Sequence, residues 1–178
     1  MRKILGGATT ALLLLSIAAA PAFAGAGAKP GTATIVDIVL VNDGEFDALQ
    51  AAVIEAGLVG ALSSTDTQYT VFAPTDWAFV STFRVLLGDN TLTEGDVIDF
   101  IEAGGVDDAF GAGALENILL YHVTEGRRIS KSVVAAPGYW MLNGDRLSRS
   151  ELVAAGLGQL NTSASNGVIH AINSVLLP

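Results

Sequence analysis

Two Asn-Gly pairs, Asn143-Gly144 and Asn166-Gly167, limit what the back half of this chain can form. Each pair lies between apolar runs, over 139–147 and 159–177. Asn-Gly in this setting is the strongest short-range signal for a β-hairpin, because both central residues are then expected to adopt positive φ. The chain after Val123 is therefore predicted to be β-structure built around two hairpins.

The front half has a different periodicity. Phe46, Leu49, Val53 and Ile54 follow the i, i+3, i+7, i+8 spacing of an amphipathic helix that is expected to end near Gly57. Further helical patterns are expected over 35–39, 58–62 and 77–87, in the acidic stretch 94–108, and at the start of 115–123, which should run into a strand. A helical front and a hairpin-rich back predict an α+β domain, with helices packed on a β-sandwich or small barrel.

The segment that joins the two patterns is a strand followed at once by a helix. Residues 69–73 (YTVFA) are β-branched, aromatic and apolar, and Pro74 ends the run, so a buried strand is predicted. Thr75 is expected to be the N-cap of the next helix, and Asp76 to lie in its positively polarised first turn. We therefore assign Thr75 and Asp76 to the fold rather than to a binding site.

The first 24 residues match the pattern of a secretory signal peptide. Arg2 and Lys3 precede a short apolar run over 12–20, and Ala22-Phe23-Ala24 is a small-x-small cleavage motif. Residues 25–32 (GAGAKPGT) have the composition of a flexible lead-in to a domain over 33–178. We expect a secreted or periplasmic protein that does not stay inserted in a membrane after cleavage.

Charge and cysteine content narrow the class of partner. The chain has 18 acidic against nine basic residues, a net charge of −9, and no cysteine. An acidic surface repels phosphate backbones, so nucleic acid is not an expected partner. Without disulfides, the apolar core alone must hold an exported domain together.

Five segments, in this order and spacing, together resemble the fasciclin domain family. The segments are Thr34-Ile-Val-Asp37, Tyr69-Thr-Val-Phe-Ala-Pro-Thr-Asp-Trp-Ala-Phe79, Leu119-Leu-Tyr-His122, Leu142-Asn-Gly144 and Asn166-Gly-Val-Ile-His-Ala-Ile-Asn-Ser-Val-Leu-Leu-Pro178. The resemblance implies a wedge-shaped β-sandwich flanked by several short helices, and a role in adhesion, matrix or surface association. It also implies candidate contacts at Tyr121-His122 and Ile172-Asn173; the family usually has Asp where Asn173 stands.

The two histidines, His122 and His170, are the first candidates for chemistry. We interpret both as structural tethers, each with one ring nitrogen donating to a backbone carbonyl. The chain has no Gly-x-Ser-x-Gly elbow and no His-x-x-x-His pair. We therefore expect no catalytic residue, no metal site, no cofactor and no enzymatic activity. The acids over 94–108 are interpreted as a solvated face, and calcium binding there is left open.

Two adjacent aromatic residues, Tyr139 and Trp140, are the remaining candidates. Neighbouring residues on a strand point to opposite faces, so one of the two should face outward, where it could dock a sugar ring or a protein. The leading hypothesis is a monomeric, non-enzymatic adhesion or protein-interaction module that binds a surface or matrix protein or a polysaccharide. The alternative is a carbohydrate or small-ligand binding module that uses Trp140 and Tyr139.

Overall fold

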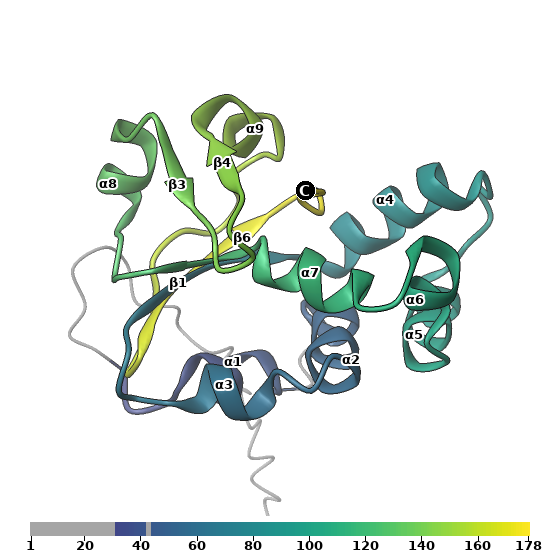
Figure 1. Cartoon of the computed structure of the whole chain (residues 1–178), viewed down its shortest axis with the longest axis horizontal. Coiled ribbons are helices and arrows are strands. Elements are labelled where there is room, and N and C mark those ends of the chain that lie inside the picture. Colours follow the sequence, from purple (N-terminus) through teal and green to yellow (C-terminus); the bar gives the residue numbers. More distant parts are fainter. Residues whose placement is uncertain (1–30, 42–43) are drawn as a thin grey trace, which may run out of the picture.

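The computed structural model describes residues 31–41 and 44–178, so the predicted signal peptide and most of the lead-in, residues 25–30, lie outside the described residues. The described strands form two sheets. The larger sheet has the order β2 (Val123–Glu125), β1 (Tyr69–Pro74), β6 (Gly167–Ile172), β5 (Thr162–Ala164), and the smaller one pairs β3 (Gly138–Trp140) with β4 (Arg146–Ser148). Figure 1 shows β1 and β6 running through the middle of the domain.

The central pair, β1 and β6, is parallel over its whole length, from Tyr69 opposite Gly167 to Pro74 opposite Ile172. Both strands are buried on both faces, as expected for parallel strands covered on each side. Val71 on one face joins the larger apolar core with the helices, whereas Phe72 on the other face joins a second core under β3 and β4. The β1–β6 pair therefore separates the two apolar cores of the domain.

Nine helices in the described residues surround this pair. They are α1 (Ile35–Val39), α2 (Asp47–Glu55), α3 (Val59–Ser63), α4 (Asp76–Leu87), α5 (Glu94–Glu102), α6 (Gly105–Phe110), α7 (Ala114–Leu120), α8 (Ser130–Ala135) and α9 (Arg149–Ala154). In Figure 1, α1 to α3 lie on one side of the central strands, α8 and α9 lie with β3 and β4 on the other, and α4 to α7 gather at one end. The α+β prediction is confirmed.

The two hairpins are present, but the backbone reason given for them is wrong. Strands β3 and β4 flank Asn143-Gly144, and β5 and β6 flank Asn166-Gly167. Of these four residues only Gly144 has positive φ, at 92°. Gly167 instead lies where a Cβ would collide with the carbonyl oxygen of Tyr69 and come 2.7 Å from Ile35 Cδ1. The second Asn-Gly pair therefore serves close packing rather than a left-handed turn.

The prediction of β-structure throughout the back half is also wrong, because α8 and α9 interrupt it. Helix α9 has a complete capping box: Ser148 Oγ accepts from Glu151 N, and the Glu151 carboxylate accepts from Ser148 N at 2.8 Å. The Ser-x-x-Glu pattern is a sequence signal for a helix start that could have predicted α9. The short apolar run of α8 offers no comparable signal.

Candidate functional site

The polar residues at the end of β1 connect two helices. Thr75 caps α4 as predicted, with Oγ1 accepting from Ala78 N at 3.3 Å. Asp76 reaches further than predicted: its Oδ1 accepts from Ala48 N at 2.8 Å, in the first turn of α2. Because the N-terminal turns of α2 and α4 both carry positive partial charge, one buried carboxylate stabilises both.

Asp76 also lies beside two other acids, a grouping that the sequence did not reveal. Within residues 31–41 and 44–178, one set of three carboxylates, Asp47, Asp76 and Glu94, has oxygens within 4.8 Å of one another. Burial first, and then the charges of Asp76 and Asp47, raise the pKa of Glu94 above its usual range. Oxygen ligands of this kind are those that Ca²⁺ uses, so this set is where a hard cation could be held.

The rest of the acidic stretch 94–108 serves local structure or faces solvent. Asp96 forms a capping box with Thr93 at the start of α5. Asp107 accepts from Gly113 N and Leu115 N at 2.8 and 2.9 Å, which fixes the turn into α7. These hydrogen bonds lower the pKa of both carboxyl groups. Most of the remaining acids in this stretch are exposed.

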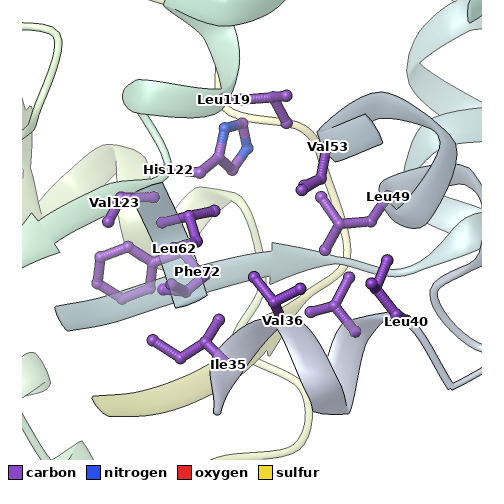
Figure 2. A pocket seen from close by; sticks show the side chains of 12 residues that line it. Ile35, Val36, Leu40, Leu49, Val53, Leu62, Phe72, Leu119, His122 and Val123 are labelled. Atoms are coloured by element: carbon purple, nitrogen blue, oxygen red, sulfur yellow. The ribbon is translucent and has the colours of Figure 1, made fainter. Parts of the chain in front are cut away.

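His122 lies between α7 and β2 with its ring inside the protein. Its Nδ1 is 2.7 Å from the carbonyl oxygen of Ile118, and its Nε2 accepts from Leu176 N at 2.9 Å. The proton therefore lies on Nδ1, and the ring joins α7 to the C-terminal segment. Figure 2 shows the ring among apolar side chains that include Leu119 and Val123. Burial lowers the pKa of His122 to about 4, so the ring is neutral.

His170 is the equivalent tether on β6. Its Nδ1 accepts from Asn161 N at 3.2 Å, and its Nε2 is 2.8 Å from the carbonyl oxygen of Arg128. The ring is fully buried and stacks on Phe72, with centroids 6.0 Å apart. Burial lowers the pKa of this ring as well. The predicted backbone tethers are confirmed for both histidines, and backbone groups occupy all four ring nitrogens, which leaves none for a metal or for general-base chemistry.

Asn166 connects several segments of the fold through its side chain, whereas the sequence pattern predicted only a place in a hairpin turn. Its Oδ1 accepts from Ile35 N at 2.8 Å, and its Nδ2 donates to the carbonyls of Leu62 and Ser64 at 2.7 and 2.9 Å. The side chain is fully buried. It therefore ties the start of α1 and the end of α3 to the β5–β6 hairpin, across more than 100 positions of sequence.

The structure corrects most of the predicted interaction residues. Tyr121, His122, Tyr139 and Ile172 are all buried, so none of these four side chains is available to a partner. Tyr139 and Ile172 lie on strands β3 and β6, whereas Tyr121 and His122 lie in the turn between α7 and β2, and all four side chains are directed into the protein interior. Asn173 stays exposed, one position past β6. An Ile-Asn contact of the kind implied by the family resemblance would need Ile172 outside the core.

Trp140 is the aromatic residue that faces outward. It is 71% exposed, whereas its neighbour Tyr139 is 5% exposed and its hydroxyl donates to the carbonyl of Ser132 at 2.8 Å. Trp140 lines an open cleft of about 530 Å³, together with Thr124, Glu125 and Arg128. The Arg128 guanidinium also lies over the Tyr139 ring, 5.2 Å from its centroid. The cleft thus offers a flat apolar ring next to one acid and one base.

The depressed histidine pKa predicts a stability loss in weak acid. In the unfolded chain His122 has a pKa near 6.5, and in the folded protein about 4, so the unfolded state binds more protons between these values. Lowering the pH from 7 to 4 should therefore reduce the free energy of unfolding by about 3 kcal/mol through His122, and His170 adds to the loss. Urea unfolding at several pH values measures this.

The matched variant for this prediction is His122→Gln, whose amide can donate to Ile118 and accept from Leu176 without titrating. It should be less stable than the wild type at pH 7 but should lose less stability on acidification. An unchanged slope of stability against pH in the variant would contradict the assignment to His122.

Comparison with known proteins places this arrangement in a family. The family model for the fasciclin domain matches residues 44–178. Protein sll1483 of Synechocystis sp. is 32% identical over 180 residues, covering 98% of this chain and 89% of that protein. The chain belongs to the fasciclin family, as the five segments suggested.

An animal protein and a solved structure extend the comparison. The transforming growth factor-beta-induced protein ig-h3 of Sus scrofa is 34% identical over 155 residues, which are 84% of this chain but 20% of that protein. A FAS1 domain pair from the insect cell adhesion molecule Fasciclin I matches with a TM-score of 0.52 at 16% identity, over 84% of this chain and 52% of that one. This likeness confirms the predicted fasciclin-type sandwich with flanking helices.

Proposed function

We propose that this protein is a non-enzymatic adhesion or protein-interaction module that acts outside the cytoplasm, as a secreted or periplasmic domain. One observation carries the proposal: five polar side chains of the matching segments bond to backbone groups within the fold, namely Thr75, Asp76, His122, Asn166 and His170. Contact with a partner must then be made by exposed side chains other than these five.

Two further features support this setting. The fasciclin domain occurs in cell-adhesion proteins, among them the insect molecule of similar fold. The pattern of residues 1–24 is that of an export signal.

None of the helices in the described residues is both long and apolar enough to cross a bilayer. The partner we propose is a surface or matrix protein, bound by a monomer, and the net charge of −9 argues against nucleic acid.

A second candidate function is carbohydrate binding at Trp140. The specific observation is the exposed indole on the wall of an open cleft that also holds Glu125 and Arg128. Sugar rings stack on flat aromatic faces, and charged groups at the edge can bond to hydroxyls. The two candidates share Trp140 and differ in the chemistry of the partner.

The test is binding of the purified, exported protein to envelope material and culture polymers of its source organism. Trp140→Ala should weaken binding by about tenfold or more, because exposed Trp residues are frequent anchors of interfaces. Trp77→Ala is the matched control, since Trp77 is 65% exposed on α4 and does not line the cleft. Equal binding by both variants would contradict a role for the cleft.

Treatment of the target separates the two candidates. Loss of binding after protease digestion favours a protein partner, and loss after periodate oxidation favours a polysaccharide. A metal-independent hydrolytic turnover that disappears in a folded His170→Ala variant would contradict the non-enzymatic proposal itself.

A further inference from the structure

A second pocket lies at the other end of the domain, between α4, α6, α7 and the C-terminal segment. Its volume is about 270 Å³. Its walls include Phe79, Phe83 and Leu86 from α4, Phe110 from α6, Ile118 from α7, and Leu177. Figure 1 shows the C-terminus close to α4, beside α7. The pocket shares no lining residue with the Trp140 cleft.

The chemistry of the walls selects against a charged ligand. No lining residue is Asp, Glu, Lys or Arg. Three lining side chains are polar, and each has a hydrogen-bond partner within the protein: Thr82 Oγ1 accepts from Val175 N at 3.3 Å, Asn117 Oδ1 accepts from Asn143 Nδ2 at 3.2 Å, and His122 bonds to two backbone groups. A charged group would be desolvated here without an ionic side chain of opposite charge, whereas apolar surface would be buried favourably.

The size of the pocket limits the ligand further. Protein interiors are packed nearly as densely as crystals, and voids larger than a water molecule are few. By contrast, the gap on the core side of His122, which Figure 2 shows, is about 20 Å³. An apolar cavity of about 150 Å³ is large enough to hold benzene. A pocket of about 270 Å³ therefore suits two fused or linked rings, or one acyl chain of moderate length.

The pocket is also open to a ligand from solvent. Phe110 and Leu177 are each 46% exposed and Leu86 is 37% exposed, and all three belong to the lining. Large apolar side chains on one surface cost free energy in water unless something covers them. Here all three belong to the lining of one pocket, which fits a small molecule that enters from solvent.

We infer that this pocket is a binding site for an uncharged apolar small molecule, of the size of two aromatic rings. The bound molecule would cover the exposed parts of Phe110, Leu86 and Leu177 and fill the space between α4 and α7. This site is independent of the proposed adhesive role, because its residues are separate from the cleft around Trp140.

The test is a fluorescence titration of the full protein with 6-propionyl-2-(dimethylamino)naphthalene, an uncharged fluorophore built on two fused aromatic rings. The wild type should bind it saturably with one-to-one stoichiometry, with a blue-shifted emission, and binding should raise Tm by mass action. Ala114→Phe places a ring inside the pocket and should weaken binding by at least about tenfold. Ala109→Phe, on exposed α6 surface outside the lining, should bind within about twofold of the wild type.

A second variant that fills the pocket with a larger side chain keeps the test decisive if Ala114→Phe does not fold. Leu86→Trp acts from the partly exposed rim and should weaken binding in the same way. Three results would overturn the inference. The first is the absence of saturable binding by the wild type, and the second is equal binding by the pocket-filling variants and the control Ala109→Phe. The third is a wild-type dimer in analytical ultracentrifugation that becomes a monomer when Ala114 is replaced with Phe. The last result would place a second copy of the chain on this surface.

Discussion

Replacing Gly167 with alanine is expected to destabilise the domain by about 3 kcal/mol, although the change adds a single carbon. A Cβ at this position would overlap the Tyr69 carbonyl oxygen and come 2.7 Å from Ile35 Cδ1. Tyr69 is the residue opposite Gly167 in the parallel β1–β6 pair, so relief of the overlap requires the central strands to move apart. Chemical unfolding of the purified protein measures the loss directly.

Gly60→Ala is the matched control for this prediction. Gly60 lies within α3, its φ is not in the left-handed region, and a Cβ there would meet nothing within 4 Å. Alanine should leave stability unchanged or raise it by up to about 1 kcal/mol, because glycine is costly inside a helix. Similar effects of the two substitutions would mean that close approach at Gly167 does not determine the β1–β6 spacing.

Replacing Asn166 with aspartate is expected to have an effect at least as large, a loss of about 4 kcal/mol. The change exchanges one NH₂ group for oxygen, and that group now donates to the carbonyls of Leu62 and Ser64. An oxygen there would face two carbonyl oxygens in a fully buried position, so two hydrogen bonds would be lost and a buried charge would keep only the hydrogen bond from Ile35 N. Stability at neutral pH measures the effect.

Asn143→Asp, in the other Asn-Gly pair, is the control. The Asn143 side chain bonds to Asn117 and Asp145 at an exposed turn, where water screens an added charge. Its cost should stay within about 1 kcal/mol. A small loss in Asn166→Asp, comparable to the control, would contradict the role of Asn166 as the link between α1, α3 and the β5–β6 hairpin.

Local sequence patterns predicted the elements whose signals are complete within a few residues. The helical spacing over 46–54, the strand at 69–73 and the cap at Thr75 correspond to α2, β1 and the start of α4. Each depends on neighbours in sequence: apolar period, β-branched content or a hydroxyl before a helix. Helix α9 had such a signal at Ser148 and Glu151, which was not used.

The candidate site was less predictable because its contacts join distant segments. Of the six proposed interaction residues, only Trp140 and Asn173 are exposed. Alternation along β3 requires Tyr139 and Trp140 to face opposite sides, but it does not say which side the second core covers. The carboxylates of Asp47, Asp76 and Glu94 meet because α2, α4 and α5 pack together, and no spacing in the sequence records this.

The sequence alone determined the family, the α+β class and the tethering role of the two histidines, because short ordered motifs and local periodicity carry that information. Tertiary structure decided which side chains remain at the surface, why Asn166 and Gly167 are needed, and where the apolar pocket opens. These properties arise from contacts between segments that are distant in the sequence, such as Ile35 with Asn166, which are 131 positions apart. Hydrogen bonds and steric overlap at such distances exist only once the chain has folded.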